Sequence, residues 1–214
     1  IHEEQWKRLA QNRVMAYLAG TAHYKLKVPV VGCNVWTNYS DSDHAGDRES
    51  GTTSRTGVML LLNGMPVHWR SNKQPTTSLS SAEAEIYALA EAVKDVKYRY
   101  WVAEEMGDRM NWPAEILVDN AAGIAFQQSI NSSTKLKGMI QLRDTWVQEM
   151  KDSKYIKAVK VSTDTNVADL LTKCLGATIR NRLIGVVEQT ASLIATSRFR
   201  GHVGRGRRLR TIRP

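Results

Sequence analysis

The sequence predicts an α/β domain with a mixed five-stranded sheet and flanking helices. Three strand-like segments come first, separated only by loops and turns, which is typical of an antiparallel meander. Two more strand-like segments follow, each after a helix-like segment. A strand reached through a helix usually lies parallel to its neighbour, with a right-handed crossover. We therefore expect an antiparallel half of three strands and a parallel half.

Length and composition are those of a globular protein. A chain of 214 residues can hold one good-sized domain with an appendage, and 42% of its residues are hydrophobic. No stretch is apolar for about 18 residues, so we expect no membrane contact. Two cysteines, Cys33 and Cys174, are too few for a disulfide framework or a zinc knuckle, which favours a reducing intracellular setting. Because the first residue is Ile1, we expect a piece of a longer chain or a processed product.

The first half of the chain supplies a helix and the three antiparallel strands. Apolar residues recur at helical spacing over residues 3–18. Apolar runs then predict strands over residues 35–41, 57–62 and 66–71. Between the last two strands, Asn63-Gly64 is a strong signal for a two-residue hairpin turn.

The second half alternates helices and strands. A long helix is expected to begin at Ser80, to carry an apolar stripe as far as Tyr100, and to end before Gly107. The remaining strands are expected over residues 116–119 and 156–162. The remaining helices are expected over residues 121–128, 139–151, 167–174 and 178–190.

Four acids lie where a predicted strand ends or a predicted helix begins: Asp41, Glu85, Asp119 and Asp169. In mixed sheets the functional crevice lies at the carboxyl ends of the parallel strands, so these side chains are expected to meet there. Four carboxylates packed together would repel one another, and hard divalent ions prefer oxygen ligands. The sequence therefore predicts a divalent-metal site. Two such ions about 3.5–4 Å apart can activate a water and stabilise a leaving oxygen.

Each acid also has an ordinary interpretation when taken alone. Asp41 and Asp119 could be turn-forming residues after strands. Asp169 could be the partner of a helix cap at Asn166. Glu83 and Glu85 could simply favour a helix N-terminus. Of these two, Glu83 fits a capping box with the Ser80 backbone amide, which leaves Glu85 for the site.

Six motifs occur in order along the chain. They are Tyr39-Ser-Asp-Ser-Asp-His-Ala-Gly-Asp47, Ser54-Arg-Thr-Gly57, Trp69 with Lys73-Gln74, Leu79-Ser-Ser-Ala-Glu-Ala-Glu-Ile-Tyr-Ala-Leu89, Val118-Asp-Asn120 and Val167-Ala-Asp-Leu-Leu-Thr-Lys173. Together they resemble the ribonuclease H domain of copia-type LTR retrotransposon Pol polyproteins, over about residues 32–175. The first helix resembles the segment that joins the reverse transcriptase to that domain.

The resemblance implies a ribonuclease H-like fold and an Asp-Glu-Asp-Asp metal site, here Asp41, Glu85, Asp119 and Asp169. It implies two Mg²⁺ ions, with Mn²⁺ as a substitute, and cleavage of the RNA strand of RNA–DNA hybrids during reverse transcription. The implied partner is the reverse transcriptase of the same polyprotein, in a cytoplasmic virus-like particle or in the nucleus. The chain then divides into the connection segment (1–31), the ribonuclease H-like domain (32–176) and a C-terminal helix with its tail (177–214).

Three positions depart from the family pattern. His44 stands where the family usually has Trp, and the segment after Thr134-Lys135 lacks a His-containing pattern common in copia elements. Cellular relatives often have a His before the last Asp, whereas residues 159–166 contain none. We therefore do not expect a histidine to assist catalysis.

Substrate contacts are expected through phosphates and 2′-hydroxyls. The candidates are Gln74, Ser80, Asn120, Lys135 and Lys137, each equally plausible as a solvated loop residue.

The positive charge is concentrated in the C-terminal tail. The net charge is +9, and residues 197–214 hold seven arginines and no acid, which accounts for all but two of these charges. Arg- and Gly-rich tails are usually disordered and bind phosphates without sequence preference. A solvated tail without a partner is the alternative interpretation.

Two other functions are compatible with the sequence. One is an inactive remnant of a retroelement that only binds nucleic acid. The other is a polynucleotidyl transferase of the integrase type, a class that places its Glu last, after two Asps. Here the Glu comes second in the order of the four acids, which favours the hydrolase.

Overall fold

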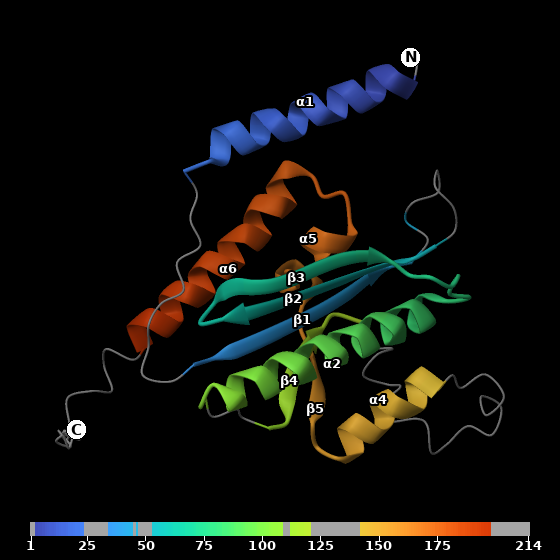
Figure 1. Cartoon of the computed structure of the whole chain (residues 1–214), viewed down its shortest axis with the longest axis vertical. Helices are drawn as coiled ribbons and strands as arrows, with labels where there is room; N and C mark the ends of the chain where they lie inside the picture. Colours follow the sequence, from blue (N-terminus) through green and yellow to red (C-terminus); the bar gives the residue numbers. More distant parts are fainter. Residues whose placement is uncertain are drawn as a thin grey trace.

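A computed structural model describes residues 3–23, 34–44, 46, 53–108, 112–120 and 142–197. Its five-stranded sheet has the strand order β3-β2-β1-β4-β5 (Figure 1). The strands are β1 (Trp36–Asp43), β2 (Arg55–Leu62), β3 (Met65–Lys73), β4 (Ala114–Val118) and β5 (Ile156–Lys160). The first three are antiparallel, while β4 lies parallel to β1 and β5 parallel to β4. The predicted mixed sheet is confirmed, and the fold is ribonuclease H-like.

The hairpin between β2 and β3 turns at the predicted Asn63-Gly64 pair. Both residues have positive φ, 52° and 82°, as a two-residue turn of this kind requires. The Asn63 side chain is buried and accepts a hydrogen bond from the Val35 backbone N–H at 2.9 Å. This asparagine thus shapes the turn and also holds the start of β1.

One face of the sheet is covered by α2 (Ser81–Glu105), with α4 (Leu142–Asp152) beside it (Figure 1). The apolar stripe of α2, including Leu89, Val93 and Val96, is fully buried against β1, β2 and β4. Gly107 follows the helix with φ +84°, as expected of a residue that ends a helix. This layer forms the larger core and fixes the orientation of the helix that carries Glu85.

The opposite face is covered by α5 (Asp169–Thr172) and α6 (Ala177–Ser197) (Figure 1). Here Tyr39 and Leu61 from the sheet pack with Val167, Ala168 and Val187. The sheet is therefore buried on both faces, and the segment that contains Asp169 is held against β1 and β2.

The first helix, α1 (Glu3–Thr21), begins as predicted and continues three residues further than expected. None of its residues is buried, and its apolar side chains, such as Trp6 and Tyr17, are more than half exposed. Among the described residues, no helix is long and apolar enough to cross a membrane. The predicted division at residues 31/32 and 176/177 stays a prediction.

Two predicted boundaries differ near the site. The strand β1 continues to Asp43, so Asp41 lies within the strand, because Ser42 and Asp43 pair with Thr56 and Arg55 of β2. The helix predicted over residues 167–174 is reduced to the single turn of α5, preceded by the 3₁₀ turn η1 (Thr163–Thr165). α5 ends at Thr172, and the backbone of the next residue, Lys173, is extended. The helix predicted over residues 121–128 lies outside the described residues.

Candidate metal centre

Three of the four predicted acids meet at one edge of the sheet. One carboxylate oxygen from each of Asp41, Glu85 and Asp119 can be chosen so that all three lie within 4.8 Å of one another. The parallel register of β1 and β4 explains the first pair. Tyr39 is the partner of Leu117, so the same offset two residues further places Asp41 beside Asp119. Residues two apart in a strand point to the same face.

Glu85 reaches this edge from the beginning of α2. Ser80 is the N-cap, and its hydroxyl accepts a hydrogen bond from the Glu83 N–H at 3.1 Å, as predicted. The Glu83 carboxylate accepts from the backbone N–H of Leu79 at 2.7 Å, one residue before Ser80, whose amide was the predicted partner. Glu83 therefore helps to cap the N-terminus of α2. Glu85, in contrast, is only 9% exposed and faces the other two acids.

The fourth acid, Asp169, is buried at the start of α5 but does not belong to the group of three. Its carboxylate bonds the Lys173 ammonium at 2.8 Å. The same Nζ lies 3.4 Å from each carboxylate oxygen of Asp41. In addition, the Thr172 hydroxyl donates to Asp41. Asp169 is thus linked to the group of three through Lys173.

Burial makes the site electrostatically unfavourable without a cation. Desolvation raises the pKa of Asp41 to about 7, against the opposing hydrogen bond from Thr172, with Asp169 adding repulsion. Desolvation, together with the charges of Asp41 and Asp119, raises the pKa of Glu85 to about 8. Burial alone would lower the pKa of Lys173, but the hydrogen bond to Asp169 and the Asp41 charge raise it above its usual value.

These residues fit a hard divalent cation. All the ligand atoms that the group offers are carboxylate oxygens, which Mg²⁺ and Mn²⁺ prefer. A cation between them would also favour the ionised forms of Asp41 and Glu85, against the desolvation and the repulsion that raise their pKa. Asp41, Glu85 and Asp119 would therefore hold such an ion.

Asn166 holds the segment that carries Asp169. Its side chain is fully buried, donates to the Ser40 carbonyl at 3.2 Å and accepts from the Ala168 N–H at 3.3 Å. Its backbone carbonyl accepts from the Asp169 N–H at 3.1 Å. Asn166 therefore joins the turn before α5 to the strand that carries Asp41.

The residues predicted to contact substrate differ in how exposed they are. Ser80 is exposed at the start of α2, and Asn120 is half-buried directly after Asp119. Gln74 is only 2% exposed, and its amide bonds Thr56, Ala84 and Ser78 within the protein. A contact between Gln74 and substrate would require its side chain to leave these bonds. Lys135 and Lys137 lie outside the described residues.

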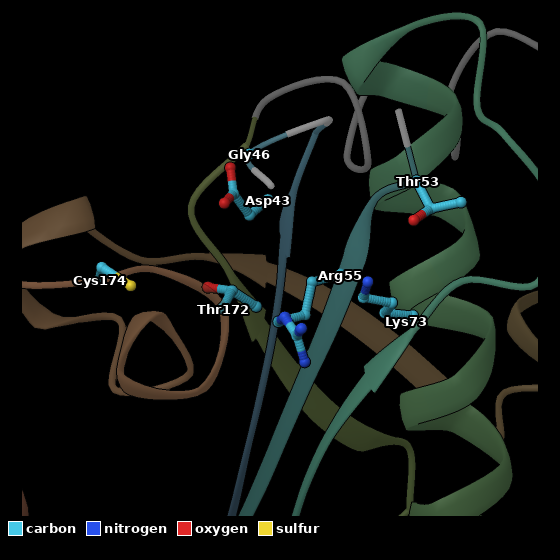
Figure 2. Close-up of a pocket in the computed structure, with 7 residues that line it drawn as sticks. All are labelled: Asp43, Gly46, Thr53, Arg55, Lys73, Thr172 and Cys174. Atoms are coloured by element: carbon cyan, nitrogen blue, oxygen red, sulfur yellow. The ribbon is translucent and has the colours of Figure 1, made fainter. Parts of the chain in front are cut away.

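Thr172, whose hydroxyl donates to Asp41, also lines a pocket (Figure 2). Asp43, Arg55 and Lys73 are successive register partners across β1, β2 and β3, so they form one row along its wall. The pocket is lined by Asp43, Gly46, Thr53, Arg55, Lys73, Thr172 and Cys174. The pocket thus holds two cationic side chains, two threonine hydroxyls and the Asp43 carboxylate.

Lys173 and Thr172 were part of a motif in the sequence, but no role was predicted for them. The signal was present, because residues four apart on a helix are neighbours and Lys173 is four residues after Asp169. His44 was noted as a departure from the family. Its Nε2 lies 3.1 Å from the Ser78 carbonyl, where it joins the end of β1 to the segment before α2.

The chain is similar to retrotransposon polyproteins along most of its length. It is 29% identical over 175 residues to the retrovirus-related Pol polyprotein from transposon TNT 1-94 of Nicotiana tabacum, which covers 80% of this chain. The chain spans only 12% of that polyprotein. It is therefore a ribonuclease H-like domain with distant similarity to copia-type Pol polyproteins. No protein-family model matches the chain.

Two further similarities concern parts of the chain. Over 90 residues it is 44% identical to the secreted RxLR effector protein 161 of Plasmopara viticola, a match that covers 42% of this chain and 61% of that protein. Among solved structures, LC11-RNase H1 in complex with an RNA/DNA hybrid covers 64% of this chain and 94% of its own, with a TM-score of 0.48 and 17% identity.

Proposed function

We propose that this domain is a ribonuclease H that hydrolyses the RNA strand of RNA–DNA hybrids with the help of Mg²⁺ or Mn²⁺. The observation that carries the proposal is the meeting of Asp41, Glu85 and Asp119, which come from three separate elements. Asp41 and Glu85 are buried and Asp119 is half-buried, and carboxylates held this close repel one another unless a cation lies between them.

The residues of the site have separate tasks in this reaction. Asp41, Glu85 and Asp119 bind the divalent cation, and Asp169 completes the set of four acids. When bound, divalent ions activate the attacking water and stabilise the leaving oxygen of a phosphodiester. The burial of Asp41 and Glu85 keeps bulk water from their carboxylates, which strengthens their interaction with a cation.

The neighbouring pocket supports a nucleic-acid substrate. Arg55 and Lys73 are register partners in the sheet and line one pocket together with Thr172 (Figure 2). Cationic side chains hold a nucleic acid through its phosphates without reading sequence. We assign these two residues to a phosphate near the scissile one. Similarity to Pol polyproteins supports reverse transcription as the setting, with the polymerase of the same polyprotein as partner.

The test is release of labelled RNA from an RNA–DNA hybrid in Mg²⁺, with and without chelator. We expect cleavage that the chelator abolishes and that Asp119→Asn removes while the variant keeps its far-UV circular dichroism spectrum. Undiminished cleavage by Asp119→Asn would show that the site is assigned to the wrong residues.

A plasmid-joining assay with the same preparations separates the alternatives. Strand joining without hybrid cleavage would favour an integrase-type transferase. Hybrid binding without either reaction would favour an inactive, nucleic-acid-binding domain.

A further inference from the structure

Lys173 occupies an unusual position for a cationic side chain. Its Nζ lies 2.8 Å from Asp169 and 3.4 Å from both carboxylate oxygens of Asp41. Asp41 is 1% exposed and Asp169 is 4% exposed, while the side chain of Lys173 is 33% exposed. The ammonium therefore lies at the solvent side of two buried acids and bridges them.

The four acids do not form a single cluster. Asp41, Glu85 and Asp119 form the group that can share a cation, and Asp169 lies outside it. The ammonium of Lys173 lies between Asp41 and Asp169, so a second cation that used these two acids would have to displace it. We propose that Lys173 fills the second cation position, so that the domain without substrate binds one divalent ion instead of two. This inference rests on the proposed metal-dependent function and specifies its metal content.

Formal charge supports the same conclusion. Four ionised carboxylates and one ammonium carry a charge of −3, which one divalent ion reduces to −1 and a second would reverse to +1. Without the ammonium the charge is −4, and two divalent ions neutralise it. The phosphate of a substrate adds negative charge, so a second ion is expected to enter only when a hybrid is bound.

Lys173 is attached to the site in a way that favours this role. It follows the last residue of α5, and its extended backbone directs the chain away from the helix. The hydroxyl of its neighbour Thr172 donates to Asp41, which holds this turn against β1. The backbone N–H of Lys173 also donates to the Asp169 carbonyl at 3.1 Å, which keeps the two residues together at the end of α5.

The test counts Mn²⁺ ions bound by the full chain without nucleic acid, from the electron paramagnetic resonance signal of free Mn²⁺ at pH 8. The wild type is expected to bind one ion and Lys173→Met two. Lys173→Arg keeps the charge and should bind one. The matched control is Lys157→Met, which removes a lysine from an exposed pair with Glu115 and should also bind one.

Other results would overturn the proposal. Two ions on the wild type, or one ion on both Lys173→Met and the second variant Lys173→Gln, would show that the ammonium does not hold the second position. A wild type whose Mn²⁺ binding is unchanged by Asp119→Asn would remove the site itself, and the proposed function with it. One ion on the wild type and two on Lys173→Met, without hybrid cleavage, would support the role of Lys173 and contradict only the proposed function.

Discussion

Gly57 is the partner of Asp41 across the antiparallel pair of β1 and β2, and α5 packs directly onto it. A Cβ atom at Gly57 would lie 2.7 Å from the Thr172 side chain and 2.8 Å from the Ala168 carbonyl. No side chain therefore fits between the sheet and the turn that carries Asp169. The glycine allows the fourth acid and Lys173 to approach Asp41.

Gly57→Ala is expected to push α5 away from the sheet. Because one contact is a backbone carbonyl, which cannot move aside as a side chain can, we expect unfolding to become easier by about 1–3 kcal/mol. Hybrid cleavage should fall at least tenfold. Thermal melting measures the change in stability, and the RNA-release assay measures the change in cleavage. The control is Gly185→Ala on α6, because a Cβ at that position would meet nothing within 4 Å. This substitution should stabilise the helix slightly. Equal behaviour of the two variants would contradict this account.

Glu83 and Glu85 should separate stability from activity. Glu85→Gln removes a ligand from the group of three, so cleavage should be lost while the melting temperature is kept or raised. Glu83→Gln can still accept from the Leu79 amide and should keep most activity. Glu83→Ala should lower stability by about 0.5–2 kcal/mol, as other losses at a helix cap do. An active Glu85→Gln beside an inactive, folded Glu83→Gln would exchange their roles.

The sheet and the group of three acids follow from local patterns. The Asn63-Gly64 turn sets the antiparallel hairpin, and the alternation of helices and strands sets the parallel half. Asp119 was predicted because it follows a buried strand, and Glu85 because Glu83 was better suited to the cap. Each of these signals acts within a few residues of the acid concerned.

The link between Asp169, Lys173 and Asp41 could not be predicted in the same way. It joins segments more than 120 residues apart, and it depends on how closely α5 approaches β2 at Gly57. Sequence periodicity predicted a full helix over residues 167–174, whereas buried Asn166 and the packing of Val167 and Ala168 leave only one helical turn. Tertiary contacts therefore decided the geometry of the fourth acid.

Gln74 offers a test of the predicted substrate contacts. Its buried amide joins the end of β3 to the beginning of α2, through the Ala84 carbonyl and the Ser78 hydroxyl. Gln74→Met keeps the shape but leaves these groups without their partner, so we expect a loss of about 1–3 kcal/mol in stability. Activity should then fall in kcat, because Glu85 is displaced, with KM for the hybrid unchanged. A raised KM with unchanged melting would instead indicate direct contact with substrate.

The stability of the metal-free protein should fall as the pH rises. Burial raises the pKa of Asp41 to about 7 and that of Glu85 to about 8, above the ordinary value of about 4 for carboxyl groups. Between these values the folded state binds more protons than the unfolded chain, and stability decreases with pH wherever that is so. The loss should begin near pH 4, continue through the folded pKa values, and be complete above about pH 8.

Divalent ions should reverse this loss, because they bind the ionised carboxylates and compete with protons. We expect Mg²⁺ to raise the melting temperature at pH 8 by several degrees and to have little effect at pH 5. The control is the double variant Asp41→Asn, Glu85→Gln, whose melting temperature should depend less on pH and not respond to Mg²⁺. Any remaining dependence in that variant measures the other titrating groups, including His68, whose pKa is lowered by burial and by Arg99. The contradicting result concerns the loss of stability between pH 5 and pH 8 in chelator. If this loss is no larger in the wild type than in the double variant, Asp41 and Glu85 are not the buried acids that the cation stabilises.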